Sequence, residues 1–400
     1  MALIGLFTEK IMDKRKIVAF TGIRSEYDLQ YSMAKELNQN ENVDFGFIVF
    51  GAHLSDRFGK TISNVESDNF KIVSKILTLF DSDSHTAKAK AAATLMNGIC
   101  DVFENYRPDL IIVAGDREET VIASTVATFL NIPVAHIFGG DKTFPEEIGD
   151  IDEQVRHATT KLSHLHFTSH PEHAKRVEMM GEETWRIHCL GSPALDKFRL
   201  YDDVPFRVIK DHFKMDITEK EYAVVIHHSL PNNIDESLSE LENILKSLEK
   251  RKVKTFLSYP NNDPGTQEII KIIDTYSNNP NFILYKNLPR ELFIPLIKHS
   301  SFLIGNSSMG LAECPILEIP AINVGKRQQG RLNAGNVIFC DIQQSSIENA
   351  IEKVQTDLNF IANLQLVKFA YGDGYSGKKI ADILATIPID NRLLAKQITY

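Results

Sequence analysis

The stretch KIVAFTGIRSEYDLQYSMAKELNQ at residues 16–39 decides the fold class. Its first part is a short run of apolar and β-branched residues, which ends in a turn at Gly22. The second part is longer and has helical spacing. Because strand, turn and helix in this order are the unit of parallel sheets, we predict a buried strand at 16–22 and a helix at 24–39.

The same pattern recurs and predicts a first α/β domain. Further strands are expected in VDFGFIVFG at 43–51, DLIIVAGD at 109–116 and PVAHIFGG at 133–140. The first of these leads to a polar loop, whereas the other two lead to helical stretches at 117–131 and 152–162. Four such cycles make one nucleotide-sized domain.

A fresh series begins near Glu221 and predicts a second α/β domain. Helices are expected at Ser237–Lys250 and Thr266–Thr275. The strands are expected in YAVVIHH (222–228), KTFLSYP (254–260), NFILYK (281–286), SFLIGNSS (301–308), PAINVG (320–325) and GNVIFCD (335–341). The junction falls within Gly191–Thr218, where no clean period is visible. We therefore predict two doubly wound domains that face each other across a cleft, with ligands at the carboxyl ends of the strands.

Composition and charge exclude several classes of protein. Among 400 residues, 53 acidic and 44 basic side chains give a formal charge of −9, a balance that repels nucleic acid. Any phosphate ligand therefore requires a localised basic site. The apolar stretches fall short of the roughly 20 residues of a membrane helix, and the start MALIGLF lacks the features of a secretion signal. We predict a cytoplasmic protein with no nucleic-acid or membrane partner.

Neither the cysteines nor the histidines predict a metal centre. The four cysteines are scattered with no CxxC pair, as expected for small buried residues in a reducing compartment. His164 and His166 have HxH spacing but lead into a strand, LHFTS, with no third ligand nearby in sequence. His136 and the pair His227 and His228 end apolar strands, where histidines are more often hydrogen-bonded core residues.

Two segments of the second domain favour diphosphate binding. In SFLIGNSSMGLAEC at 301–314, a tight turn and a helix beginning near Ser307 direct N–H groups, hydroxyls and a helix dipole to one place. The loop GKRQQGR at 325–331 adds Arg327 and Arg331, whose guanidinium groups can clamp phosphate oxygens. A Ser-Ser turn alone is also explained by helix capping, so the pairing with the basic loop carries the prediction.

The turns of the first domain carry charged residues in place of a dinucleotide fingerprint. TGIRSEYD at 21–28 reads GxR rather than GxGxxG, which disfavours a nicotinamide-dependent dehydrogenase. AGDREE at 114–119 places Asp116 after a strand, either as a helix N-cap or as a general base beside the cation Arg117. After Asp141, most of five crowded acidic residues are expected to be structural. They are Glu146, Glu147, Asp150, Asp152 and Glu153.

The order of these motifs resembles that of the UDP-N-acetylglucosamine 2-epimerases, most closely the hydrolysing branch that serves biosynthesis of sialic-acid-type sugars. The matching segments cover nearly the whole chain. They are TGIRSEYDL (21–29), GAHLSDRFG (51–59), GDREE (115–119), HIFGGD (136–141), IDEQVRHATTKLSHLHF (151–167), LGSPALD (190–196), YPNNDPG (259–265), GNSS (305–308), INVGKRQQGR (322–331) and YGDGYSGKKIADIL (371–384).

This resemblance implies a GT-B-like fold of two Rossmann-like domains. It implies an N-terminal domain at 1–190 with the acid and base residues, a nucleotide-binding domain at 191–370, and a helix at 371–400 that crosses back to the first domain. It also implies a homodimer or homotetramer and a reaction that requires no cofactor or metal.

The implied reaction has two stages. A base removes the proton from sugar carbon 2 while UDP leaves carbon 1, and water then adds to the 2-acetamidoglucal to release N-acetylmannosamine. Residues with catalytic roles by resemblance or position are Asp116, Asp152, His228, Arg117, Glu146 and Glu147. Residues that contact the nucleotide or substrate by resemblance are Arg24, Arg117, His228, Asn261, Ser307, Ser308, Glu313, Arg327 and Arg331.

One departure from the family concerns Phe138 in HIFGGD, where the family usually carries a catalytic Glu. Asp141, Glu146 or Glu147 then supplies the carboxylate, or the substrate differs. UDP-N-acetylglucosamine is the first expectation. The alternatives are a 2,4-diacetamido-6-deoxy sugar of the legionaminic type, for which Phe138 lines a less polar pocket, a GDP-linked donor, a non-hydrolysing epimerase, a GT-B glycosyltransferase and an inactive nucleotide-sugar binder.

Overall fold

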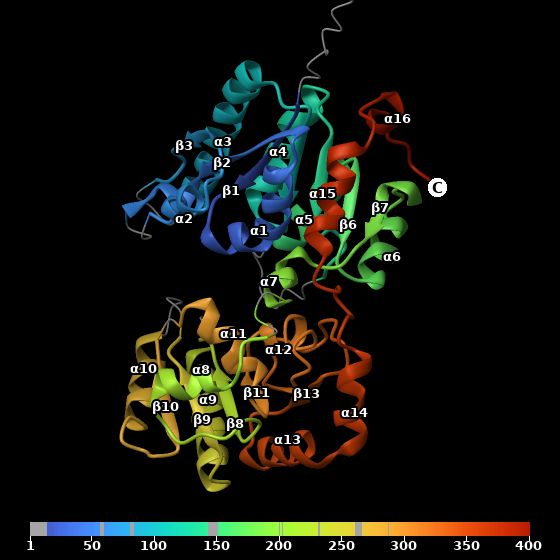
Figure 1. The fold of residues 1–400 in the computed structure, drawn as a ribbon. Coiled ribbons are helices and arrows are strands. Elements are labelled where there is room, and N and C mark those ends of the chain that lie inside the picture. The colour runs from blue at the N-terminus through green and yellow to red at the C-terminus, as the bar shows by residue number, and fades with distance from the viewer. Residues whose placement is uncertain are drawn as a thin grey trace, which may run out of the picture. The chain divides into compact units, whose positions relative to one another are not determined.

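The computed structural model describes residues 14–56, 60–80, 84–142, 151–199, 201, 203–230, 233–260, 266–286 and 288–400. The chain forms two compact units (Figure 1). Unit 1 comprises the chain up to Ala194 together with Tyr375–Tyr400, and unit 2 comprises Leu195–Gly374. Each unit contains one parallel β-sheet, so the predicted α/β class is confirmed.

Unit 1 is built on a seven-stranded sheet in the order β3-β2-β1-β4-β5-β6-β7. Its strands are β1 (Arg15–Thr21), β2 (Val43–Phe50), β3 (Ile72–Ile76), β4 (Leu110–Ala114), β5 (Val134–Ile137), β6 (Leu165–Thr168) and β7 (Ile187–Cys189). The sequence pattern did not reveal the two edge strands. β3 is mostly half-exposed and contains Lys75, and β7 has only three residues, so neither reads as a buried apolar run.

Helices cover both faces of this sheet (Figure 1). They are α1 (Arg24–Gln39), α2 (Ile62–Ser67), α3 (His85–Tyr106), α4 (Glu118–Phe129), α5 (Asp152–Leu162), α6 (Pro171–Met179), α15 (Ser376–Thr386) and α16 (Asn391–Leu394). Alternate side chains of β1 point to opposite faces of the sheet. Ile17 and Ala19 belong to a core with α1 and α15, whereas Val18 and Phe20 belong to a core with α3 and α4.

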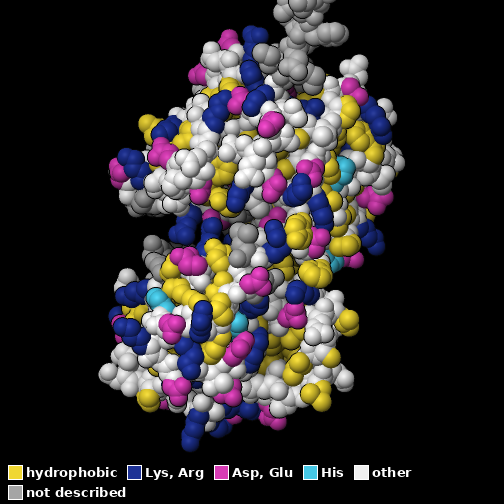
Figure 2. Space-filling model, viewed as in Figure 1, with side chains coloured by type: hydrophobic (Ala, Val, Ile, Leu, Met, Phe, Trp, Pro, Cys, Tyr) yellow, Lys and Arg dark blue, Asp and Glu magenta, His cyan; other side chains and the backbone are white. Residues whose placement is uncertain are grey.

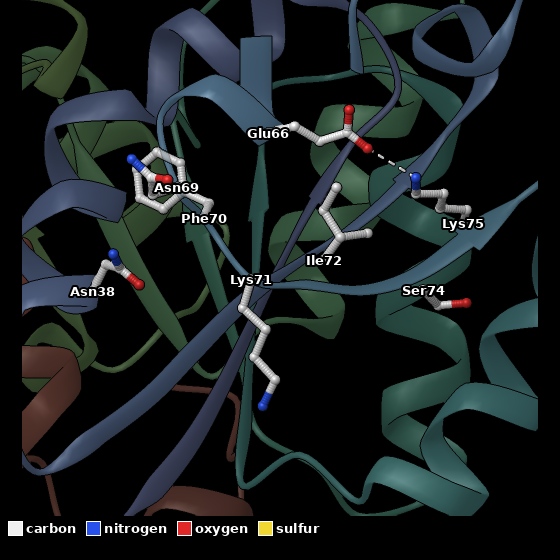
Figure 3. Close-up of a pocket in the computed structure, with 8 residues that line it drawn as sticks. All are labelled: Asn38, Glu66, Asn69, Phe70, Lys71, Ile72, Ser74 and Lys75. Carbon is white, nitrogen blue, oxygen red and sulfur yellow. Dashed lines mark hydrogen bonds and ion pairs between the residues drawn. The ribbon is translucent and has the colours of Figure 1, made fainter. Parts of the chain in front are cut away.

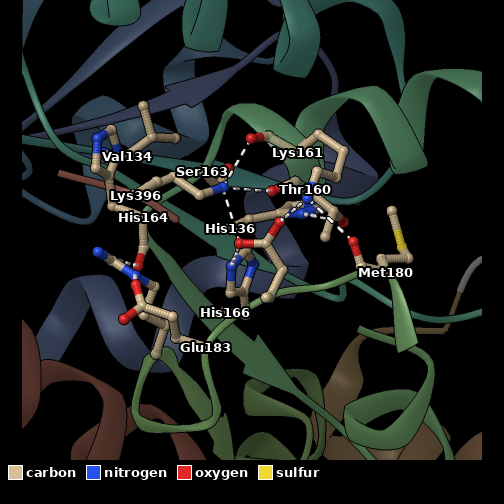
Figure 4. Close-up of polar contacts among 12 residues, drawn as sticks. Val134, His136, Thr160, Lys161, Ser163, His164, His166, Met180, Glu183 and Lys396 are labelled. Carbon is tan, nitrogen blue, oxygen red and sulfur yellow. Dashed lines mark hydrogen bonds and ion pairs between the residues drawn. The ribbon is translucent and has the colours of Figure 1, made fainter. Parts of the chain in front are cut away.

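The end of the chain is held to unit 1 by buried charges. Arg186, which is fully buried, donates hydrogen bonds to the carbonyls of Arg392, Leu393 and Ala395 at 2.7 to 3.3 Å. Lys396 Nζ lies 2.8 Å from the buried carboxylate of Glu182, beside the histidines seen in Figure 4. The last residues are therefore part of the fold of unit 1.

Unit 2 is built on a six-stranded parallel sheet in the order β10-β9-β8-β11-β12-β13. Its strands are β8 (Tyr222–Ile226), β9 (Lys254–Ser258), β10 (Phe282–Tyr285), β11 (Phe302–Gly305), β12 (Ala321–Val324) and β13 (Val337–Cys340). All six lie within the segments that the sequence pattern indicated. Relative to the first strand of each unit, this is the same order as the first six strands of unit 1.

The helices of unit 2 begin within the predicted junction. They are α7 (Asp196–Arg199), α8 (Arg207–Phe213), α9 (Ile234–Lys250), α10 (Thr266–Thr275), α11 (Arg290–Lys298), α12 (Met309–Ala312), α13 (Gln344–Thr356) and α14 (Leu358–Leu366). α9 starts at Ile234 rather than at Ser237, because the Asn233 side chain caps it by accepting the N–H of Glu236. Among the described helices, none combines the length and apolarity needed to cross a membrane.

Candidate active site

In both units the strand order reverses at one point, between β1 and β4 in unit 1 and between β8 and β11 in unit 2. Ligands of doubly wound sheets bind at the carboxyl ends of the strands beside such a switch point. Arg24, the exposed first residue of α1, follows β1, and Asp116 and Arg117 follow β4. His228 follows β8, and Ser307 follows β11. The predicted residues therefore gather at the two switch points.

Asp116 is paired with an arginine that the sequence did not single out. Its Oδ2 accepts a hydrogen bond from Nη2 of Arg156 on α5, and Arg156 also reaches Glu153 Oε1 at 3.0 Å. Arg156 is 1% exposed. Its burial lowers the guanidinium pKa, but the nearby carboxylates more than offset this and the pKa is raised. The Asp116 side chain stays 30% exposed, so a fixed cation orients a carboxylate that solvent can reach.

The structure distinguishes between Asp116 as a helix N-cap and Asp116 as a carboxylate beside a cation. Arg117, not Asp116, occupies the N-cap position of α4, and it makes no side-chain capping bond. The cation hydrogen-bonded to Asp116 is Arg156 rather than its neighbour Arg117. The geometry is therefore that of a carboxylate held by a cation, with a different cation from the one expected.

Arg117 instead faces two buried carboxyl groups. Its Nε lies 3.0 Å from Glu26 Oε1 and 3.1 Å from Glu119 Oε1. Glu26 is 5% exposed and Glu119 is 4% exposed. Burial, followed by the adjacent Glu119, raises the pKa of Glu26 well above its usual value. Arg117 opposes this rise in the Glu26 pKa, so the cation and the two buried carboxyl groups form one charged cluster.

A cavity of about 320 Å³ lies beside this group. Arg117, Glu118 and Glu119 form part of its wall, and the rest of the lining is mostly apolar. The apolar residues are Ile23, Phe50, Ala52, Leu79, Ala91, Ala92, Leu95 and Ile122. Another cavity, of about 620 Å³, lies beside β3 around Phe70 and Lys71 (Figure 3). No predicted site residue that the structure describes lines that second cavity.

The turn after β5 contains the departure from the family. Phe138 has a φ of +71° and packs against the core on the α1 side of the sheet. Asp141 follows in the same turn, and its Oδ1 lies 3.4 Å from Nε2 of the buried His173. Asp152 is the half-buried first residue of α5. Glu146 and Glu147 lie outside the described residues, so Asp141 and Asp152 are the predicted carboxylates that the structure places here.

In unit 2 the switch point is organised by Asn306, which is fully buried. Its Oδ1 accepts the N–H of His228 at 2.8 Å, and its Nδ2 donates to the His228 carbonyl at 2.9 Å. Its own carbonyl accepts hydrogen bonds from Arg327 Nη1 at 3.0 Å and Gln328 Nε2 at 3.2 Å. One amide side chain and its backbone thus join the turns after β8, β11 and β12.

The helix after the GNSS turn is too short to provide the expected helix dipole. α12 has only four residues and starts at Met309, with Ser308 as N-cap but no side-chain capping bond. Ser307 Oγ accepts the N–H of Met309 at 3.3 Å. Pro315 follows closely, and the residue before a proline avoids the helical region. The dipole of a full-length helix is therefore absent at this turn. The groups of the turn that can bind an anion are its hydroxyl and backbone N–H groups.

Glu313 and Arg331 complete the described part of this site. Arg331 Nη1 donates to Gln328 Oε1 at 3.0 Å, so it belongs to the same loop network as Arg327. Burial raises the pKa of Glu313, against the charges of Lys197 and Arg331. Its Oε2 is buried without a hydrogen-bond partner among the described residues. Asn261 lies outside the described residues.

The histidines divide between core and site. His136 is fully buried, with Nε2 2.8 Å from the Gly115 carbonyl and Nδ1 3.2 Å from Thr160 Oγ1. Burial lowers its pKa to about 3. His164 and His166 also lie in buried hydrogen bonds (Figure 4). The interpretation of His136 as a hydrogen-bonded core residue is confirmed.

The cysteines are free, but the expectation that all are buried is wrong. Cys314 is buried, Cys340 is intermediate, and Cys100 and Cys189 are exposed. Cys189 ends the short edge strand β7, where one side of the strand has no neighbour to cover it. On the face drawn in Figure 2, basic and acidic side chains are interspersed among the described residues rather than separated into one basic surface.

Two doubly wound units with polar residues at both switch points define the GT-B-like class of α/β proteins. A sequence model described as UDP-N-acetylglucosamine 2-epimerase matches residues 35–385, and the chain belongs to this family. The predicted family resemblance is thereby confirmed.

Two relatives and one solved structure show where the chain lies within the family. It is 31% identical to the UDP-N,N'-diacetylbacillosamine 2-epimerase (hydrolyzing) of Legionella pneumophila, over 96% of this chain and 100% of that protein. It is 32% identical to the GDP/UDP-N,N'-diacetylbacillosamine 2-epimerase (hydrolyzing) of Campylobacter jejuni, over 86% and 88%. The UDP-GlcNAc 2-epimerase of Neisseria meningitidis, crystallised with UDP-GlcNAc, has a TM-score of 0.76 at 19% identity, over 92% and 99%.

Proposed function

We propose that the protein is a hydrolysing 2-epimerase of a UDP-linked 2,4-diacetamido-6-deoxy sugar. The observation that carries this proposal is the pair of relatives above, both named for a diacetylbacillosamine substrate and both matched over most of their length. This substrate was an alternative in the sequence analysis. It is better supported than UDP-N-acetylglucosamine, the first expectation.

The proposed reaction starts with removal of the C2 proton. Asp116 is the candidate base, because the buried Arg156 orients it and its side chain stays partly exposed. The C1–O bond to UDP breaks as the C2 proton leaves, which gives a 2-acetamidoglucal and UDP. Water then adds, with its hydroxyl on C1 and its proton on the opposite face of C2. Asp141 or Asp152 is the candidate acid for this second step.

The unit 2 site supports a nucleoside diphosphate as the other half of the ligand. Two phosphates require cations and hydroxyl or N–H donors, which Arg327, Arg331, Ser307 and Ser308 can provide. The buried Glu313 Oε2 has no partner among the described residues, and a ribose hydroxyl would satisfy it. Arg24, Arg117 and His228 stay predictions as further contacts of the diphosphate.

The cavity beside Arg117 supports a less polar sugar. A 6-deoxy sugar carries a methyl group where N-acetylglucosamine carries a hydroxymethyl group, and its second acetamido group adds another methyl. Aliphatic side chains make up most of the wall of this cavity. They would favour methyl groups over a hydroxyl group, because burying the hydroxyl removes its hydrogen bonds to water. Phe138 packs against the core, and the lining given for this cavity does not include it.

The test is turnover in deuterated water followed by proton NMR, with UDP-N,N'-diacetylbacillosamine and UDP-N-acetylglucosamine in parallel. We expect UDP and a free sugar epimerised at C2, with deuterium at C2, and a higher kcat/KM for the diacetamido substrate. Faster turnover of UDP-N-acetylglucosamine would instead support this sugar nucleotide, the first expectation, as the substrate. Intact epimerised nucleotide sugar would indicate the non-hydrolysing branch. UDP binding without turnover of either donor would indicate a silent binder.

A further inference from the structure

Glu240 is a fully buried carboxyl group that the proposed reaction does not use. It lies on α9, the helix that follows β8, and is 0% exposed. Its Oε2 accepts a hydrogen bond of 3.3 Å from Asn306 Nδ2 and lies 3.8 Å from Nε2 of the buried His227. Its Oε1 has no hydrogen-bond partner among the described residues. Such a group is costly to bury, so its position calls for a reason.

The basic loop of unit 2 is shaped around this carboxyl group. Gly325 follows β12 directly and has a φ of +78°. A Cβ atom at this position would collide with Oε1 of Glu240, so only glycine fits here. Lys326 and Arg327 come next in sequence. The loop therefore leaves the sheet in contact with Glu240.

Asn306 connects Glu240 to the candidate binding residues. The same Nδ2 that donates to Glu240 also donates to the His228 carbonyl, while Oδ1 holds the His228 N–H. The Asn306 carbonyl accepts a hydrogen bond from Arg327, and Ser307 is the next residue. An acceptor at position 240 therefore fixes the orientation of the amide on which this arrangement depends.

We propose that Glu240 is a positioning residue for the nucleotide: by holding the Asn306 amide, it sets the His228 backbone and the Arg327 guanidinium for the diphosphate. This inference rests on the proposed function, since it takes UDP as the ligand of unit 2. Glu240 itself does not touch the ligand in this proposal. Its charge matters nevertheless, because it lies behind a site for an anion.

Groups from every neighbouring element decide that charge. They are His227 at the end of β8, Glu236 on α9, Asn306 after β11, Arg327 after β12 and Cys340 on β13. Burial raises the pKa of Glu240 to about 7; the Asn306 hydrogen bond and Arg327 oppose the rise, and Glu236 adds to it. Burial lowers the pKa of His227 to about 3, so His227 is neutral. Above neutral pH, ionised Glu240 adds a negative charge near the diphosphate.

The experiment measures UDP affinity by calorimetry from pH 6 to pH 8.5 for the native chain, Glu240→Gln and Glu242→Gln. Gln keeps the acceptor for Asn306 but cannot ionise. Glu242 is a half-exposed glutamate on the same helix and serves as the matched control. We expect the ratio of native to Glu240→Gln Kd to rise ~3- to 10-fold across this range. The Glu242→Gln profile should follow the native one. Because UDP ionises identically in all three titrations, its own titration cancels in the ratios.

Two further measurements separate the possible failures. Uridine, which lacks the diphosphate, should bind the native chain without the loss of affinity above pH 7 that UDP shows, and this arm needs no variant. Normal UDP binding with parallel profiles for native and Glu240→Gln would overturn this inference alone. Absence of UDP binding by the native chain at every pH would overturn the proposed function, and this inference with it.

Discussion

Each unit buries a glutamate on the helix that follows the first strand of its switch point, but the two glutamates have different surroundings. Glu26 lies on α1, the helix after β1, and Glu240 lies on α9, the helix after β8. Each therefore lies behind the strand at which its sheet reverses order. Burial is the largest cause of the raised pKa in both. Glu26 meets a second carboxyl group and an arginine, whereas Glu240 meets an amide.

This difference matches the chemistry proposed for each unit. In unit 1, Arg117 lies within 3.1 Å of Glu26 and Glu119, and Arg156 pairs separately with Asp116, which suits a site where protons move. Around Glu240, Asn306 provides fixed neutral donors and acceptors, with the cation Arg327 on the outside. That arrangement suits binding of an anion without proton transfer. Substitutions in each unit test this difference.

The largest effect is expected for Asp116→Asn. The amide cannot take the C2 proton, so we expect turnover to fall by ~10³-fold or more while UDP affinity changes by less than about twofold. NMR of deuterium incorporation and calorimetry with UDP measure the two quantities. Asp101→Asn, on the exposed face of α3, should leave both unchanged. Retention of native turnover in Asp116→Asn would move the base to Asp141 or Asp152.

The second largest effect is expected for Arg156→Met, which tests how much the buried ion pairs of Arg156 stabilise the fold. Removal of the buried guanidinium leaves Asp116 and Glu153 without their cation, so we expect a loss of ~3 kcal/mol in the free energy of unfolding. Arg251→Met removes a partly exposed ion pair with Glu352 and should cost less than about 1 kcal/mol. Urea denaturation of both variants gives the comparison. Equal losses would show that burial does not distinguish the two pairs.

A smaller effect is expected in unit 2 for Arg327→Lys. Lysine keeps the charge but loses the planar fork and the hydrogen bond to the Asn306 carbonyl, so UDP affinity should fall ~10-fold. Arg251→Lys on the far side of α9 is the matched control and should bind UDP as the native chain does. Undiminished UDP affinity in Arg327→Lys would mean that groups other than the Arg327 guanidinium bind the diphosphate.

The smallest effect concerns the proton held by Glu26. Because its pKa in the folded chain lies well above the ordinary 4.5, the native chain loses stability as pH rises from about 4.5 through that raised pKa. Glu26→Gln removes this loss. Its stability relative to native should therefore increase from pH 5 to pH 8, starting within ~1 kcal/mol at pH 5. Denaturation at the two pH values tests this, and a constant difference would mean that Glu26 is ionised throughout.

Glu119→Gln is the companion to this last variant. It leaves Arg117 beside a carboxyl group that prefers its proton, so it should be more destabilising than Glu26→Gln at pH 5. The reverse order would contradict this account of the pair.

Much of the fold could be predicted, because apolar strands and strongly amphipathic helices are visible as local patterns of apolar residues in the sequence. All six strands of unit 2 lie where the pattern indicated. The edge strand β3 was missed because most of its residues are only half-buried and it contains Ser74 and Lys75, so it is not a continuous apolar run. The helix expected to begin near Ser307 begins at Met309 and has only four residues. Local pattern thus fails where tertiary surroundings determine the outcome.

The site was only partly predictable for a related reason. Asp116, Arg327 and Ser307 follow strands, which a sequence shows, but the partners that hold them come from distant elements. Arg156 lies in the segment IDEQVRHATTKLSHLHF that matches the family, but the sequence does not say which arginine is buried. Glu240 did leave a readable signal. It shares the apolar face of α9 with Leu241 and Ile244, where a glutamate is unexpected.

The carbonyls that Arg186 holds in place belong to residues 392, 393 and 395, near the end of the chain. During synthesis, unit 2 is a continuous stretch, 195–374, and has all of its strands once that stretch has emerged. Unit 1 starts first but lacks α15 and the acceptors of a buried guanidinium until residues 376–395 have emerged. The unit that begins the chain is therefore the last that can complete its fold on the ribosome.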